Sequence, residues 1–174
     1  MLKFLKKGKN LCLIGFMGSG KSALGKDLSK IYKMDFIDTD HEIERITGKS
    51  IEELFSEFGE GYFRKIEEKT CIKALENNNC IISLGGGSII NSKIRKGIKK
   101  NSYSIYLKVD KNILLKRLRY SQKRPLLNDA NIEDVVEELF NQRKNYYNEA
   151  DLIIDNNYDR KKVLENIKSQ FKKL

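Results

Sequence analysis

The stretch Gly15-Phe16-Met17-Gly18-Ser19-Gly20-Lys21-Ser22 decides the fold of this 174-residue chain. It fits the pattern G-x-x-x-x-G-K-[S/T], follows an apolar run and precedes an amphipathic segment. Glycines here let the backbone curl, so that successive N–H groups and the start of the following helix face a phosphate group. The motif therefore predicts a phosphate-binding loop between a strand and a helix, formed by Gly18, Ser19, Gly20, Lys21, Ser22 and Ala23.

The last two residues of the motif indicate the ligand. A lysine at this position reaches the β- and γ-phosphates of a nucleoside triphosphate, and the adjacent hydroxyl binds Mg²⁺. We therefore expect ATP and Mg²⁺ as ligands, with Lys21 on the phosphates and Ser22 on the metal ion.

Short apolar runs alternate with helical patterns along the chain, which is typical of a parallel sheet covered by helices. A capping box at Ser50 predicts the start of one helix, and Glu60–Asn77 is predicted to be another. The polar stretch 119–131 contains the only proline and is expected to be a lid within a single domain spanning 1–174. The predicted strands are Asn10–Gly15, Asp35–Asp38, Cys80–Leu84, Ser102–Lys108 and Leu152–Asp155.

Composition limits the partners and the compartment. The net charge is +10, but the basic residues are scattered from Lys3 to Lys173 without a nucleic-acid-binding module, so we expect no nucleic acid partner. A nucleotide-dependent nucleic-acid-binding protein remains the alternative that this charge motivates. The three cysteines form no CxxC pair and favour reduced thiols in the cytoplasm. No apolar run approaches the roughly 18 residues of a membrane span, and we expect a soluble monomer.

Two aspartates follow the second predicted strand, in Asp38-Thr39-Asp40. Ligands of open parallel sheets lie at the carboxyl ends of the strands, so both carboxylates are expected near the phosphate-binding loop. We assign Asp38 to Mg²⁺ through its water shell, and Asp40 to accept or orient the proton of an attacking hydroxyl. The alternative is that Asp40 only caps the following helix.

Three further features favour an anionic acceptor. Arg64 has Glu67 three residues later on the same helix face, where the carboxylate can hold it in place. Gly85-Gly86-Gly87 follows the third strand, where it permits close contact with a ligand or a tight turn. Arg143 lies in phase with an apolar stripe, so its buried charge requires a carboxylate or a bound anion.

Taken in order, these motifs resemble shikimate kinases over nearly the whole chain. The resemblance rests on the glycine-rich loop, Asp38-Thr39-Asp40, Tyr62 to Glu67, Gly85-Gly86-Gly87, Arg124-Pro125-Leu126-Leu127 and Arg143. It implies a P-loop fold like that of nucleoside monophosphate kinases, with strand order 2-3-1-4-5. It also implies ATP-dependent phosphorylation of the 3-hydroxyl of shikimate, on the pathway to chorismate and the aromatic amino acids.

The resemblance also implies roles for single residues. Arg64 and Arg143 would clamp the shikimate carboxylate, Glu67 would steady the site, and Asp40 with the three glycines would contact the ring hydroxyls. Arg124 would close from the lid onto the phosphates. Arg117 would pack on adenine beside 155–157, where this chain has Asn156 and Asn157 instead of the proline of many members.

A different acceptor on the same fold remains open at this point, because two arginines suit a phosphate as well as a carboxylate. Gluconate and nucleotide kinases are the alternatives.

Overall fold

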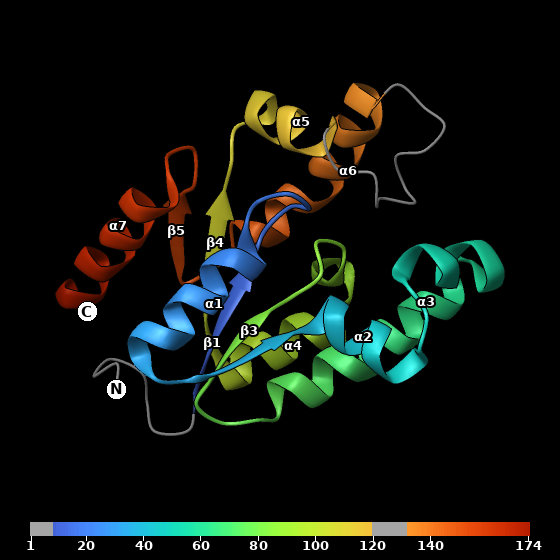
Figure 1. Cartoon of the computed structure of the whole chain (residues 1–174), viewed down its shortest axis with the longest axis horizontal. Helices are drawn as coiled ribbons and strands as arrows, with labels where there is room; N and C mark the ends of the chain where they lie inside the picture. The colour runs from blue at the N-terminus through green and yellow to red at the C-terminus, as the bar shows by residue number, and fades with distance from the viewer. Residues whose placement is uncertain (1–8, 120–131) are drawn as a thin grey trace.

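The computed structural model describes residues 9–119 and 132–174, which form a parallel five-stranded sheet covered by helices (Figure 1). The strand order is β2-β3-β1-β4-β5, as predicted, and every neighbouring pair is parallel. The ends of two strands differ from the prediction by one residue. The strands are β1 (Asn10–Ile14), β2 (Asp35–Asp38), β3 (Cys80–Ser83), β4 (Ser102–Lys108) and β5 (Leu152–Asp155).

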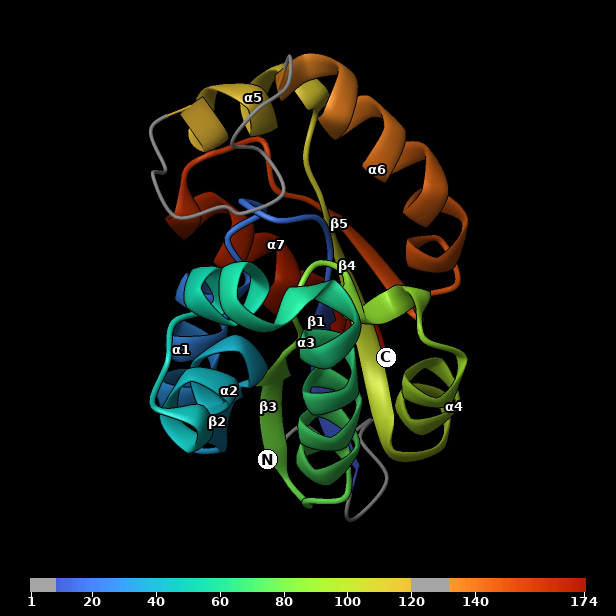
Figure 2. The ribbon, with the colours of Figure 1, turned by 90° about the vertical axis from the view of Figure 1, so that its right-hand side faces the viewer.

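Helices cover both faces of this sheet. They are α1 (Lys21–Tyr32), α2 (Thr39–Thr47), α3 (Ile51–Leu75), α4 (Ser92–Asn101), α5 (Lys111–Arg119), α6 (Ile132–Tyr147) and α7 (Arg160–Lys173), with a short 3₁₀ helix η1 (Ser88–Ile90). Figure 2 shows α1 and α7 on one side of the sheet and α3 and α4 on the other.

The central strand β1 is apolar because both of its faces are buried. Leu11 and Leu13 belong to the core beneath α1 and α7, whereas Cys12 and Ile14 belong to the core beneath α3, α4 and α6. Each of these four side chains is at most 3% exposed. The near-continuous apolar run is therefore what a strand between two helical layers requires.

The helix α3 contains the two helices that the sequence predicts. Ser50 and Glu53 form the expected capping box, and the helix breaks at Gly59, where φ is 78°. Only glycine adopts this backbone conformation at little cost. The second half ends at Leu75, two residues before its predicted end at Asn77.

Gly25 on α1 provides a test of this packing. A Cβ atom there would lie 2.4 Å from the Phe36 ring and 3.2 Å from Leu13 Cδ1, whereas a Cβ atom at helical Gly61 would contact nothing within 4 Å. We predict that Gly25→Ala lowers the free energy of unfolding by about 1–3 kcal/mol through overpacking. Gly61→Ala should instead raise it by about 0.5–1 kcal/mol. Urea titration measures both, and equal changes of the same sign would contradict this packing.

Candidate active site

Three loops meet at the carboxyl edge of the sheet, because β1, β2 and β3 are parallel neighbours. They are the glycine-rich loop after β1, the start of α2 after β2, and Gly85–Gly87 after β3. The predicted nucleotide and acceptor residues on these loops therefore lie side by side.

Lys21 lies inside the curl of the glycine-rich loop. Its Nζ donates hydrogen bonds to the carbonyl oxygens of Gly15 at 2.9 Å and Phe16 at 3.0 Å. Its side chain is mostly buried, while Ser22 and Ala23 are exposed in the first turn of α1. The structure thus has the predicted loop shape, with the cation at its centre.

Asn156 fastens this loop from the opposite end of the chain, a role that the sequence did not predict. Its Nδ2 donates to the Ser19 carbonyl at 2.5 Å, and its backbone N–H donates to Lys108 at 2.7 Å. Arg117 donates to the carbonyls of Gly18 at 3.3 Å and Asn156 at 3.1 Å. The loop after β5 and the helix α5 therefore hold the phosphate-binding loop together. The packing of Arg117 on adenine stays a prediction.

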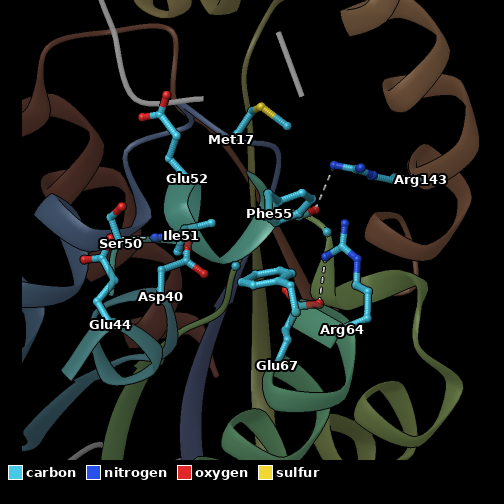
Figure 3. Close-up of a pocket in the computed structure, with 14 residues that line it drawn as sticks. Met17, Asp40, Glu44, Ser50, Ile51, Glu52, Phe55, Arg64, Glu67 and Arg143 are labelled. Carbon is cyan, nitrogen blue, oxygen red and sulfur yellow. Dashed lines mark hydrogen bonds and ion pairs between the residues drawn. The ribbon is translucent and has the colours of Figure 1, made fainter. Parts of the chain in front are cut away.

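The two aspartates after β2 have different surroundings. Asp38 caps α2, because its Oδ1 accepts the N–H groups of Asp40 at 3.1 Å and His41 at 3.4 Å. The alternative interpretation, which gave the cap to Asp40, is therefore wrong. Asp40 is in the first turn of α2 and lines a cavity instead (Figure 3).

Mg²⁺ fits the residues at this edge of the sheet. It prefers oxygen ligands, usually keeps several waters and binds through one or two carboxylates plus substrate phosphates. Ser22 offers a hydroxyl and Asp38 a carboxylate, and the described residues hold no cluster of three or more acidic, histidine or cysteine side chains that would make an all-protein cage. The predicted roles of these two residues toward Mg²⁺ are compatible with this geometry.

A cavity of about 340 Å³ brings all seven predicted acceptor-binding residues together (Figure 3). They are Asp40, Arg64, Glu67, Gly85, Gly86, Gly87 and Arg143. The rest of the wall was not predicted from the sequence. It is formed by Met17, Glu44, Ser50, Ile51, Glu52, Phe55 and Phe63. Most of these come from α2 and the first half of α3, whose amphipathic pattern does not distinguish a cavity wall from a core.

Ionic side chains lie against the backbone of two of the glycines after β3. A Cβ atom at Gly85 would be 2.5 Å from Asp40 Oδ1, and one at Gly87 would be 2.6 Å from Arg64 Nη1. The Thr39 hydroxyl accepts the Gly85 N–H at 3.1 Å, which ties the start of α2 to this turn. The tight turn is therefore present, and contact of these glycines with a ligand stays a prediction.

Arg64 is held by two carboxylates on its own helix. Its Nη1 donates to Glu67 Oε2 at 2.7 Å, and its Nη2 donates to Glu60 Oε1 at 2.8 Å. Burial opposes the charge of Arg64, but these carboxylates more than offset it and raise its pKa. Glu67 is 2% exposed and also accepts the Ser88 hydroxyl at 2.8 Å. The Arg64–Glu67 pair is thus present as predicted, and Glu60 and Ser88 are additional supports.

Arg143 differs from Arg64 because it has no carboxylate partner among the described residues. It is 1% exposed, its Nη1 is 3.4 Å from the Gly86 carbonyl, and its Nε has no hydrogen-bond partner in the described chain. The guanidinium lies over the Phe16 ring, 5.6 Å from its centre. Burial, assisted by the charge of Arg64, lowers the pKa of Arg143. This buried cation lines the cavity, where a bound anion would compensate its charge.

The family model for shikimate kinase matches residues 17–172. This chain belongs to the shikimate kinase family. A shikimate kinase from Rhizobium leguminosarum bv. trifolii is 38% identical over 90% of this chain and 80% of its own length. One from Thermodesulfovibrio yellowstonii is 40% identical over 84% of this chain and 85% of its own length.

Solved structures agree with this membership. Shikimate kinase from Acinetobacter baumannii, in complex with shikimate, superposes with a TM-score of 0.88 at 31% identity and covers 98% of each chain. A deoxyadenosine kinase from M. mycoides and a gluconokinase from Sinorhizobium meliloti share the fold, with TM-scores of 0.66 and 0.64 at 15% and 11% identity. The nucleoside monophosphate kinase-like P-loop fold is therefore confirmed.

The predicted roles of Arg124 and of the lid stay predictions. Arg124 and most of the expected lid, 119–131, lie outside the described part of the chain. No helix in the described part is long and apolar enough to cross a membrane.

Asn156 allows the nucleotide side of the site to be tested alone. We predict that Asn156→Ala raises the KM for ATP about fivefold, because a lost hydrogen bond of about 1 kcal/mol frees the Ser19 carbonyl and loosens the loop. The KM for the acceptor should change less than twofold. Asn77→Ala is the matched control, because the Asn77 side chain donates to the carbonyls of Lys73 and Ala74 on α3 instead of holding the loop. Steady-state kinetics with each substrate varied would refute this role if both variants behaved alike.

Proposed function

We propose that this chain transfers the γ-phosphoryl group of ATP to the 3-hydroxyl of shikimate, giving ADP and shikimate 3-phosphate. The observation that carries the proposal is the buried Arg143 guanidinium, which faces a cavity beside the phosphate-binding loop and has no carboxylate partner in the described chain. A planar guanidinium suits a carboxylate in a bidentate pair. Family membership supports shikimate as the molecule that carries this carboxylate.

The cavity is divided by charge, and the division supports one orientation of the acceptor. Arg64 and Arg143 lie on one side, where Glu67 is paired with Arg64. Asp40 and Glu44 lie on the other side (Figure 3). A polyhydroxylated acid would direct its carboxylate to the arginines and its hydroxyls to the aspartate. A phosphate could bind the arginines equally well, so family membership, and not charge, favours shikimate over a nucleoside monophosphate.

In the proposed reaction, the acceptor hydroxyl oxygen bonds to the γ-phosphorus while the bond to the bridging oxygen breaks, and ADP leaves. The Asp40 carboxylate accepts or orients the hydroxyl proton. Lys21 holds the β- and γ-phosphates, and Arg124 closes from the lid onto them. Mg²⁺, held by Ser22 and through water by Asp38, would neutralise charge on the phosphate oxygens.

The same proposal covers the setting of the enzyme. We infer a single-domain monomer of the cytoplasm that acts on a small molecule and binds no nucleic acid. The scattered distribution of the net +10 charge supports this, since nucleic-acid-binding proteins gather their basic residues in a patch or stripe.

The direct test is ADP release from Mg·ATP by the purified protein, with shikimate, gluconate or AMP as the acceptor. Large stimulation by shikimate alone is expected. Stimulation by gluconate or AMP but not by shikimate would reassign the acceptor. No stimulation by any of them, in protein that binds ATP, would reject the proposal.

Arg143→Ala tests the acceptor side. We predict that it raises the KM for shikimate about tenfold or more, because a hydrogen bond to a charged group contributes about 1.5–3 kcal/mol. The KM for ATP should change less than twofold. Lys144→Ala, an exposed neighbour on α6, is the control and should change neither value. Equal effects of Arg143→Ala on both substrates would argue against a carboxylate-binding role.

Asp40→Asn tests the chemical step. We predict that kcat falls by at least about 100-fold, because the amide cannot accept the hydroxyl proton. The unfolding temperature should stay close to that of the unchanged protein, since Asp38 supplies the cap of α2. Glu42→Gln, on the same helix and outside the cavity wall, is the matched control. A near-normal turnover in Asp40→Asn would remove Asp40 from the mechanism.

A further inference from the structure

The Gly86 carbonyl receives two donors from α6. The Tyr147 hydroxyl donates to it at 2.5 Å, and Arg143 Nη1 lies at 3.4 Å from the same oxygen. Tyr147 is the last residue of α6 and is 1% exposed. No feature of the sequence indicated a function for this tyrosine.

The two contacts differ in strength. A carbonyl oxygen can accept two hydrogen bonds, and O–H···O bonds are strongest near 2.7 Å, while N–H···O contacts beyond about 3.2 Å are weak. The Tyr147 hydroxyl is therefore the main hydrogen-bond donor to the Gly86 carbonyl oxygen. The Gly86 oxygen therefore holds the Arg143 guanidinium only weakly, and the guanidinium also has a side-chain hydrogen bond with Tyr147 itself.

Tyr147 is fixed in place by its ring and remains protonated. The ring stacks on Tyr106 of β4, with centres 5.0 Å apart and planes at 14°. Burial raises the pKa of the Tyr147 hydroxyl far above its ordinary value, although the charge of Arg143 opposes this rise. The hydroxyl is therefore a permanent donor at physiological pH.

Gly86 also contacts the nucleotide side of the site. A Cβ atom at Gly86 would lie 2.8 Å from the backbone nitrogen of Met17 in the glycine-rich loop. The Gly86 peptide thus lies between Arg143 and the phosphate-binding loop. A residue that fixes the Gly86 carbonyl therefore also helps to fix the position of the acceptor cavity relative to the phosphate-binding loop.

We propose that Tyr147 is a positioning residue for the acceptor: by holding the Gly86 carbonyl, its hydroxyl keeps the Arg143 guanidinium directed at the acceptor carboxylate. The inference rests on the proposed function and deepens it. Without the hydroxyl, Arg143 is the remaining donor to this oxygen among the described residues, and the guanidinium is drawn toward the carbonyl and away from the ligand.

Tyr147→Phe removes the hydroxyl and keeps the stacked ring. The expected result is a rise in the KM for shikimate of about fivefold, the effect of one lost hydrogen bond, with the KM for ATP changed less than twofold. Tyr106→Phe is the matched control: it removes a buried hydroxyl from the same stack without touching Gly86, and both KM values should stay as they are. Titration with ATP counts the folded fraction of each preparation, so poor folding cannot imitate the effect.

A second comparison separates positioning from general support. In an Arg143→Ala background, Tyr147→Phe should add less than a twofold further change in the KM for shikimate, because the residue through which it acts is gone. A fivefold change in both backgrounds, an unchanged KM in Tyr147→Phe alone, or equal effects of Tyr147→Phe and Tyr106→Phe would each overturn the inference. If the unchanged protein does not phosphorylate shikimate, the proposed function fails first.

Discussion

A buried positive charge without a carboxylate partner in the described chain is the constraint on which the site depends. The Arg143 guanidinium is 1% exposed, and its Nε has no hydrogen-bond partner within residues 9–119 and 132–174. Leaving a buried charge uncompensated is costly, and arginine keeps its proton instead of discharging it. An anion in the cavity removes this cost. An acidic acceptor would place a compensating charge beside this guanidinium, which is a physical reason to expect one.

The rest of the structure keeps this charge close to the phosphate-binding loop. The central strand β1 is buried on both faces, so the start of the loop that follows it is anchored between two cores. The Gly86 peptide contacts that loop on one side and receives Tyr147 and Arg143 on the other. Donor and acceptor sites thus share one short segment of backbone. A short distance between the two ligands is useful in phosphoryl transfer, where catalysis is mostly positioning and electrostatic stabilisation.

Local patterns predicted much of this arrangement. The strands followed from apolar runs, and the inward position of Arg143 followed from its phase relative to Val136 and Leu139 on a single helix. The helix cap after β2 was less certain, because a helix start displaced by two residues exchanges the roles of Asp38 and Asp40. The structure resolved this in favour of Asp38 as the cap.

What the sequence did not predict consists mainly of contacts between distant segments. Asn156 reaches Ser19 across 137 positions, and Tyr147 reaches Gly86 across 61. A single asparagine after a strand or a tyrosine at a helix end has no periodic signal that identifies its partner. The apolar wall contributed by Phe55 and Phe63 was missed because cavity walls and cores have the same helical pattern.

The most direct measurement compares the binding of shikimate with that of its primary amide, which has nearly the same shape and no charge, by titration calorimetry. If the Arg143 guanidinium binds the carboxylate of the acceptor, shikimate should bind the unchanged protein at least about tenfold more tightly than its amide does. Arg143→Ala should lose most of that preference. Equal binding of the acid and the amide by the unchanged protein would contradict the account.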